Sequence, residues 1–159
     1  FEQGKRELAI ELAKQLIDTE NPLSSEYKRA LGLLCEASIA LRRGLAAAKY
    51  CEQSLADETV IENRRSLHRR LGSVYREMVG DCQKAIEHFS KALAFGGTSV
   101  LDERTILGRA SCAYELGDLG LAQSDVNLLT SRGAKLIRKT EVNDLLHLLK
   151  TGQNKKAKN

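Results

Sequence analysis

Alanine recurs along this chain at a nearly constant interval. Ala9, Ala47, Ala85 and Ala122 are separated by 38, 38 and 37 residues. Each of them is followed, four and seven positions later, by mostly small or apolar residues that lie on the same helix face. A helical unit of this kind cannot bury its apolar face alone, so neighbouring units must share a core. The spacing therefore predicts a row of stacked helical units.

The composition favours an all-α fold in one domain. The 159 residues include a single proline, four tyrosines, three phenylalanines and no tryptophan, and 29% of them are charged. This balance favours helices over strands. No apolar run approaches the roughly 20 residues of a membrane-spanning helix, and no secretory signal opens the chain, so we expect a soluble protein. Because Phe1 stands inside a helical pattern, we also expect further sequence upstream.

The four cysteines are predicted to be reduced and unpaired. Cys35, Cys51, Cys82 and Cys112 form no CxxC pair and have no histidine at a ligand-like offset, which argues against zinc. Helical phase places three of them near the interior, where a free thiol behaves as a small apolar residue. A packed fold without a secretory signal needs no disulfides, so we expect a cytoplasmic or other reducing compartment.

Helical periodicity and end signals predict most of the elements. We expect helices over residues 5–18, 25–43 and 45–56, with Asn21-Pro22 ending the first and Ser24 or Ser25 capping the second. Gly44 should break the chain between the second and third. A final amphipathic helix is predicted at about 140–150. The lysine-rich residues 151–159 should form a disordered basic tail.

Residues 68–93 carry the most distinctive pattern. They contain Leu71-Gly72-x-x-Tyr75 in one predicted helix and Ala85-x-x-x-Phe89 in the next. This pattern resembles the tetratricopeptide repeat, in which a small residue lets two helices approach and aromatic residues fill the space at their crossing. The segment departs from the family at His68, where a bulky aromatic is usual. It also has one extra residue before Ala85, so we expect a slightly longer turn.

The resemblance extends to both sides of this segment. Residues 106–129 repeat the pattern around a Gly117-Asp118 turn, and the stretch that ends there resembles co-chaperone-type repeats. Residues 4–17 resemble the second helix of an earlier repeat. The resemblance implies a right-handed α-solenoid of about three hairpins over residues 1–150, preceded by a half-repeat and closed by the capping helix. The implied packing anchors are Ala9, Ala37, Ala47, Gly72, Tyr75, Ala85, Phe89, Ala92, Ala110 and Ala122.

The first helices of tetratricopeptide hairpins usually line a concave groove, and this places a basic stripe on the predicted groove. Arg65, Arg69 and Arg76 step by four and seven residues along one helix. An acidic or phosphorylated peptide would complement them. The alternative is a solvated basic face balanced by Glu58, Glu62 and Glu77. The full predicted groove set is Leu34, Ser38, Leu41, Arg65, Arg69, Ser73, Arg76, Arg104, Leu107, Ser111 and Tyr114.

One tetratricopeptide class binds the C-terminal carboxylate of heat-shock chaperones through lysine, asparagine and arginine side chains. The corresponding positions here are occupied by Leu34, Ser38, Arg70, Arg104 and Gly108. Only Arg104 among them suits that clamp. In a shifted register the positions fall on Cys35, Ser66 and Arg70, and again one cation fits. The chaperone carboxylate clamp is therefore not supported.

No motif in the chain argues for catalysis, a cofactor or a metal. Phosphate-binding loops, nucleotide fingerprints, nucleophile elbows and zinc-protease motifs are absent. The three histidines, His68, His88 and His147, stand on different predicted helices. We interpret His88 as a surface residue beside Phe89 and His147 as similarly without function. We therefore expect a non-enzymatic protein.

Three functions fit these observations. The leading one is a protein-interaction scaffold or adaptor that binds an amphipathic helix or an acidic peptide segment of a partner protein. The second is RNA binding through residues 64–70, residues 132–139 and the basic tail, although base-stacking aromatics are scarce and the net charge is only +4. The third is self-association through an apolar edge at Leu8, Leu12 and Leu16.

Overall fold

The protein folds entirely into helices in the part that the structure describes. The computed structural model describes residues 2–96, 100–131 and 139–152, and no strand occurs among them. The predicted all-α class is confirmed. The elements are α1 (Glu2–Thr19), α2 (Ser25–Ala40), α3 (Gly44–Ala56), α4 (Ile61–Val74), a π-helical turn η1 (Tyr75–Val79), α5 (Cys82–Ala94), α6 (Val100–Leu116), α7 (Leu119–Ser131) and α8 (Lys139–Thr151).

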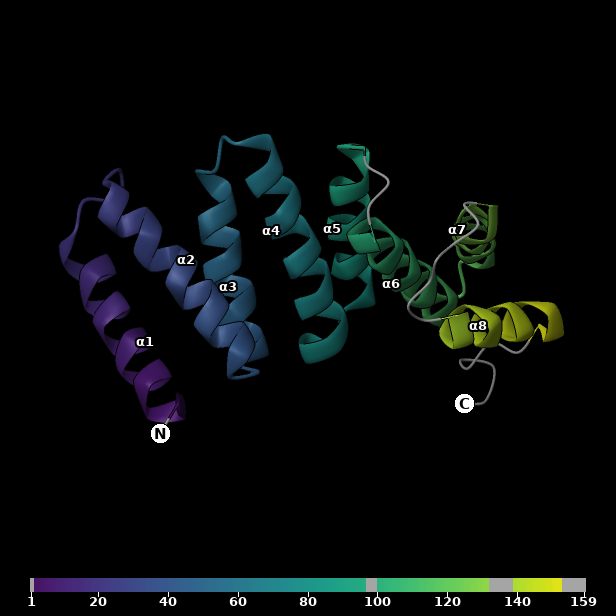
Figure 1. The fold of residues 1–159 in the computed structure, drawn as a ribbon, viewed down its shortest axis with the longest axis horizontal. Helices are drawn as coiled ribbons and strands as arrows, with labels where there is room; N and C mark the ends of the chain where they lie inside the picture. Colours follow the sequence, from purple (N-terminus) through teal and green to yellow (C-terminus); the bar gives the residue numbers. More distant parts are fainter. Residues whose placement is uncertain (1, 97–99, 132–138, 153–159) are drawn as a thin grey trace.

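The helices form a row in which each packs mainly on its neighbours in sequence (Figure 1). The α2–α3, α4–α5 and α6–α7 pairs are hairpins, and α1 packs on α2 at one end of the row. Helix α4 also contacts α6, and α8 packs on α7 and α6 at the other end. The predicted helix at 140–150 is thus present, whereas the predicted basic patch at 132–138 and tail from 153 lie outside the described residues.

Short polar side chains begin three of the helices. Ser24, Asp81 and Asp118 precede α2, α5 and α7, and each accepts a hydrogen bond from a backbone N–H of the first turn at 3.0 or 3.1 Å. These bonds satisfy amide groups that have no partner within the helix. The chain reverses before two of these helices at Gly80 and Gly117, both with positive φ. Sequence alone therefore accounts for most of the helix boundaries.

Gly44 has a different role from the one predicted. The positive φ in the α2–α3 turn belongs to Arg42, and Gly44 is already the first residue of α3. A Cβ atom on Gly44 would lie 2.9 Å from the Cβ of Met78. The absence of a side chain therefore allows the close approach of α3 and η1 rather than the helix break.

Three of the four repeated alanines lie in the core. Ala47, Ala85 and Ala122 are fully buried, but Ala9 is exposed, so its prediction as a packing anchor is wrong. Helix α1 instead turns Ile10 and Ala13 toward α2. The reason is that Ile10 buries more apolar surface than Ala9 would in the single interface that α1 makes. The other predicted anchors are buried, except Ala37, which is half-buried.

The ring of Phe89 is held between two glycines. A Cβ on Gly72 of α4 would lie 2.4 Å from one edge of the ring, and a Cβ on Gly108 of α6 would lie 2.9 Å from the other edge. Phe89 is 3% exposed. The predicted close approach at Gly72 is confirmed, and Gly108 is a second contact that the sequence analysis did not identify. One α5 side chain thus packs against both α4 and α6.

The extra residue before Ala85 does not lengthen the turn as predicted. The α4 helix instead widens into the π-helical turn η1, and the Asp81 N–H donates to the Tyr75 carbonyl at 2.8 Å. Only Gly80 and Asp81 connect η1 to α5. A π-helical turn accommodates one additional residue without interrupting the helix. The extra residue is therefore accommodated within η1, and the connection to α5 stays short.

The cysteines are paired, and the prediction of reduced thiols is wrong. Cys35 of α2 is bonded to Cys51 of α3, and Cys82 of α5 is bonded to Cys112 of α6, with Cα–Cα distances of 4.8 and 5.0 Å. Helical phase placed Cys35, Cys51 and Cys112 near the interior but did not show that neighbouring helices bring the cysteines together in pairs. The cysteines consequently no longer support a reducing compartment.

Replacing Gly72 by alanine should destabilise the protein. The new methyl group would overlap the Phe89 ring, which cannot move away because Gly108 closes its other side. We expect a loss of about 1–3 kcal/mol in the free energy of unfolding, measured by urea denaturation. Gly32→Ala is the matched control, since nothing lies within 4 Å of its added Cβ in α2. Equal effects of the two changes would contradict the packing described here.

Alkylation of the denatured, unreduced protein should modify none of the four cysteines. Reduction should then expose all four, as counted by mass spectrometry. Each bridge limits the freedom of the unfolded chain, so reduction should lower the free energy of unfolding by about 2–4 kcal/mol per bridge. Modification of any cysteine before reduction would contradict the pairing.

Candidate functional site

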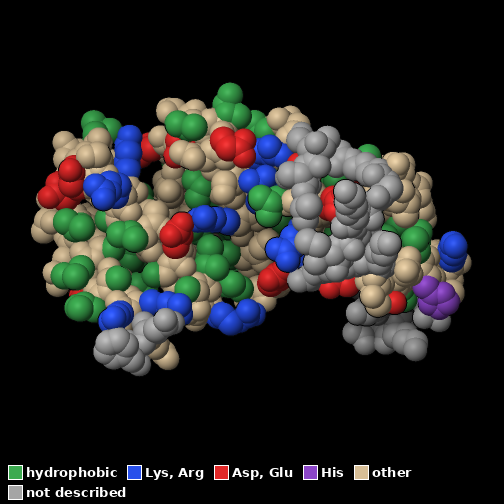
Figure 2. All heavy atoms as spheres, viewed as in Figure 1, with side chains coloured by type: hydrophobic (Ala, Val, Ile, Leu, Met, Phe, Trp, Pro, Cys, Tyr) green, Lys and Arg blue, Asp and Glu red, His purple; other side chains and the backbone are tan. Residues whose placement is uncertain are grey.

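A groove of about 540 Å³ runs between α4, η1 and α6. Its basic and hydroxyl lining includes Arg69, Arg70, Ser73, Arg76 and Arg104, and Leu107 contributes apolar surface. Glu77 and Glu141 of α8 also line it. Figure 2 shows lysine and arginine side chains gathered near the middle of this face, with acidic side chains among them. The groove is thus basic but not uniformly so.

The structure brings together about half of the predicted groove residues. Arg69, Ser73, Arg76, Arg104 and Leu107 line the groove. Three others, Leu34, Ser38 and Tyr114, are buried, so their prediction as ligand-contacting residues is wrong. On these faces, the first hairpin and α6 pack against neighbouring helices, which leaves no open groove there. Leu41 is half-buried in the α1–α2 core, and the Ser111 hydroxyl donates to the Leu107 carbonyl at 2.9 Å.

Two arginines of the predicted stripe are committed to a buried carboxylate. Asp102, at the start of α6, is 1% exposed, and its Oδ1 lies 2.5 Å from Arg65 Nη2 and 3.7 Å from Arg69 Nη1. The hydrogen bond with Asp102 raises the pKa of Arg65. Removing one member would leave an uncompensated buried charge, which is strongly destabilising. Arg65 and Arg69 therefore join α4 to α6 and are poor candidates for ligand binding.

The remaining groove cations are less constrained. Arg70 pairs with Glu36 at 2.8 Å, but both side chains are exposed, and such pairs contribute little. Among the residues that the structure describes, Arg76 forms an ion pair only with the adjacent Glu77, at 3.9 Å. Arg104 is exposed and forms no ion pair with any residue that the structure describes. Arg76 and Arg104 are consequently the arginines best able to bind a ligand.

The absence of a side chain at Gly108 leaves room for the Arg76 side chain. Nη1 of Arg76 lies 3.6 Å from the position that a Cβ on Gly108 would occupy. The Arg76 side chain therefore reaches from η1 across to α6. Arg104 is one helical turn before Gly108 on the same helix. Arg76 and Arg104 thus line the same groove from two different helices.

A histidine pair lies outside the groove, between α4 and α5. Nδ1 of His68 and Nδ1 of His88 are 3.0 Å apart, and the His88 ring stacks on Tyr75. His68 is 4% exposed and His88 is half-buried, so the interpretation of His88 as a surface residue is wrong. Burial lowers the pKa of His68 to about 4 and also lowers that of His88. No sequence spacing could have identified this pair, because its members are 20 residues apart on two helices.

Tyr75 belongs to the same polar layer. Its hydroxyl donates to the Glu52 carboxylate of α3, and Lys84 Nζ lies 4.9 Å from the centre of its ring. Burial, followed by the hydrogen bond to Glu52, raises the pKa of Tyr75. The layer connects α3, η1 and α5 through side chains that satisfy one another. We assign it to packing of the second hairpin.

The described residues contain no cluster suited to a metal ion. Within residues 2–96, 100–131 and 139–152, no three His, Cys, Asp or Glu side chains are placed to hold a metal ion. Among the helices of these segments, none is long and apolar enough to cross a bilayer. Phe89 is the one aromatic side chain that lines the groove in this part of the chain, and it is buried.

Comparison with protein-family models and with curated protein sequences gives no match. Fold and groove therefore define the chain only as an all-helical protein with a basic groove.

Acidification should destabilise the fold through the histidine pair. Burial disfavours the charged form of both histidines in the folded protein, whereas in the unfolded chain they take up protons below about pH 6.5. The unfolded state then binds more protons, so stability is complete above about pH 6.5 and falls as the pH decreases toward 4. For His68 the loss should reach about 3 kcal/mol, measured by urea denaturation at a series of pH values.

Carboxylates titrate in part of the same range, so variants are needed to isolate the histidines. The double variant His68→Leu, His88→Leu should show a clearly smaller loss of stability between pH 6.5 and 4. His147→Gln is the matched control, because His147 is exposed on α8, and it should behave as the unchanged protein. The same loss in all three proteins would show that the pair is not responsible.

Proposed function

We propose that this protein is a non-enzymatic interaction scaffold that binds an acidic segment of a partner protein in the groove between α4, η1 and α6. The observation that carries the proposal is that Arg76 and Arg104, from two different helices, line one groove without a strong ion pair to any described residue. The proposal includes a tetratricopeptide-like α-solenoid as the fold. Cytoplasmic adaptors of that kind bind partners on the surface that the first helices of their hairpins form.

Several features support the solenoid. The hairpins follow one another in a row, and the α4–α5 hairpin carries Gly72, Tyr75, Ala85 and Phe89 at the positions of the repeat pattern. Phe89 packs against α4 of its own hairpin and against α6 of the next. In a repeat array, contacts of this kind between successive units are expected to contribute part of the stability.

The chemistry of the groove favours an acidic peptide. Arginine binds carboxylates and phosphates through two parallel hydrogen bonds, and two arginines from different helices select the position of the anion as well as its charge. Leu101 and Met78 line the same groove and offer apolar surface to neighbouring side chains of the segment, whereas Leu107 is almost fully buried. A peptide with an acidic residue beside an apolar one therefore complements both features.

RNA binding is the less favoured alternative. Tyr75 and Phe89, the aromatic side chains nearest the groove, are 4% and 3% exposed. Single-stranded RNA is usually bound by stacking bases on exposed aromatic rings, and the described part of the groove provides none. Arg69, one of its arginines, also pairs with Asp102. An RNA ligand would thus be held by few phosphate contacts.

The test compares the double variant Arg76→Glu, Arg104→Glu with the unchanged protein. Fluorescence anisotropy with a labelled peptide of alternating glutamate and leucine measures affinity, and a labelled oligouridine serves as the RNA probe. We expect peptide affinity to fall at least about tenfold, or ~1.4 kcal/mol, because both cations become repulsive. Arg69 is left unchanged because its loss would unbalance Asp102.

The double variant Arg29→Glu, Lys49→Glu is the matched control. It changes the net charge equally at two exposed cations outside the groove. Its peptide affinity should remain close to that of the unchanged protein. Equal losses in the two variants would show that overall charge, rather than the groove, determines binding. Stronger binding of oligouridine than of the peptide, lost in the groove variant, would favour the RNA alternative.

A further inference from the structure

Two serine side chains line the groove together with its arginines. Ser66 and Ser73 both belong to α4, and neither hydroxyl forms a hydrogen bond with any residue that the structure describes. Hydroxyl groups in helices often donate to the carbonyl four residues earlier, as those of Thr105 and Ser111 in α6 do. The hydroxyls of Ser66 and Ser73 can therefore donate to a molecule bound in the groove.

Ser73 lies between two arginines along one helix face. Arg70 is three residues before it, and Arg76 is three residues after it in η1, which continues α4 without a break. Residues three apart are neighbours on a helix surface, and all three side chains line the groove. The Arg76 side chain is 31% exposed. A neutral donor and two cations thus stand side by side on this wall of the groove.

We propose that the acidic group bound in the groove is the phosphate of a phosphorylated serine or threonine, held at Ser73 and Arg76. The inference rests on the proposed function and specifies its ligand. A phosphate monoester carries about −1.5 to −2 charges at neutral pH and has three strong acceptor oxygens. These oxygens can accept from the Ser73 hydroxyl and, through two parallel hydrogen bonds, from the Arg76 guanidinium. A carboxylate has two oxygens and one charge, so it uses these donors less fully.

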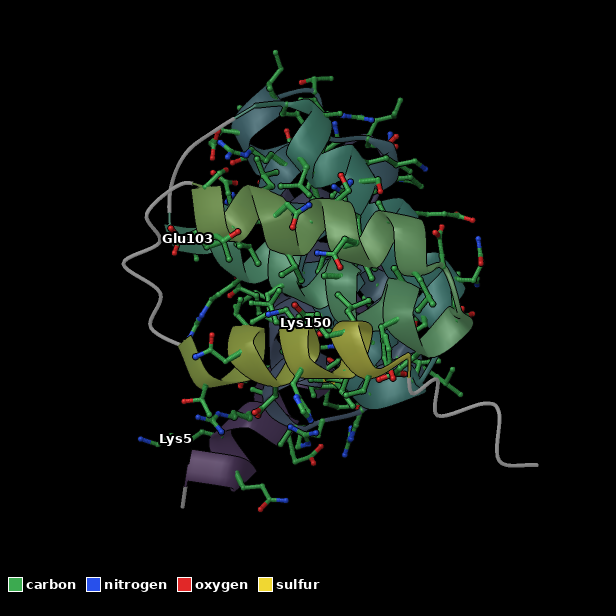
Figure 3. All side chains as sticks on the ribbon, turned by 90° about the vertical axis from the view of Figure 1, so that its right-hand side faces the viewer. Lys5, Glu103 and Lys150 are labelled. Atoms are coloured by element: carbon green, nitrogen blue, oxygen red, sulfur yellow. A yellow bond between two sulfur atoms is a disulfide. The ribbon has the colours of Figure 1, made fainter. Side chains whose placement is uncertain are left out.

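The acidic side chains of the groove also favour a single concentrated charge. Glu77 follows Arg76 directly, and Glu141 lines the groove from α8, which packs on α6 and α7 at the end of the row (Figure 3). A segment with many carboxylates would meet like charges along its length. A phosphate instead places its charge at one point. The Arg76–Glu77 pair gives way readily to such an anion, because Glu77 is 54% exposed and exposed pairs contribute little.

A phosphorylated peptide suits the groove better than the phosphates of RNA do. Each phosphate of a nucleic acid carries one negative charge, so it gains less from the same donors. The surface beside Arg76 is apolar, since Met78 and Leu101 line the groove there. Apolar side chains next to a phosphoserine can cover this surface, whereas the sugars and bases of an unstacked strand offer no such match.

Three labelled peptides of otherwise identical, leucine-containing sequence test the ligand by fluorescence anisotropy. One carries phosphoserine at its centre, one carries glutamate and one carries serine. The phosphoserine peptide should bind at least about tenfold more tightly than the glutamate peptide, because it has more charge and more acceptors for the same donors. Equal affinities for these two would overturn the phosphate assignment and leave the proposed function intact. Binding of neither would reject both.

Two alanine variants test the position of the phosphate. Ser73→Ala should weaken binding of the phosphoserine peptide about tenfold, because a hydrogen bond to a charged group is lost. Ser66→Ala is the matched control, since its hydroxyl is also unbonded among the described residues but lies about 10 Å earlier along the same helix. It should bind as the unchanged protein does. Equal losses in the two variants, or no loss in Ser73→Ala, would contradict the placement at Ser73.

Competition with unlabelled oligouridine separates a peptide ligand from a nucleic acid. We expect at least about tenfold more oligouridine than unlabelled phosphoserine peptide to be needed for the same displacement, since its phosphates carry single charges. Circular dichroism confirms that each variant is folded. Displacement by oligouridine at equal or lower concentration would show that the groove binds nucleic-acid phosphates, and the phosphopeptide assignment would be wrong.

Discussion

The contact of Phe89 with Gly72 and Gly108 is the constraint on which the middle of the structure depends. One ring from α5 fills the space between α4 and α6, and both helices can approach it only because each presents a glycine there. Because protein interiors are packed at high density, there is no room for an additional methyl group on either side of the ring. The distance between α4 and α6 is therefore set by the thickness of one aromatic ring. The groove forms on the outer side of this contact.

The same two helices also divide the arginines into two groups. Asp102 sits at the start of α6, opposite Arg65 and Arg69 of α4, and is too buried to remain charged without them. Arg76 lies one turn after Gly72, where the chain has entered η1, and extends over Gly108. Residues that look equivalent in a basic stripe thus differ in function. The first group pairs with Asp102, and the second forms no strong ion pair with any described residue.

Local sequence signals predicted the helices and their ends well. Ser24 caps α2 as expected, and the repeat pattern placed Gly72 against Phe89. The wrong predictions arose where two positions or two faces of a helix have similar side chains. Ala9 and Ile10 are adjacent apolar residues, and only packing on α2 decides which is buried. Leu34, Ser38 and Tyr114 fit a groove-facing phase on their helices, but neighbouring helices cover them.

By itself, the sequence determined the all-helical class, the order and approximate bounds of the helices, and the small residues at which they approach. These properties follow from periodicity, caps and side-chain volume, which act within one helix or between adjacent ones. Only the tertiary structure decided the Cys82–Cys112 bridge, the His68–His88 pair and the division of the arginines by Asp102. Each of these joins side chains 20 to 37 residues apart. Their meeting depends on the angles and rotations at which whole helices pack, and no local pattern encodes those.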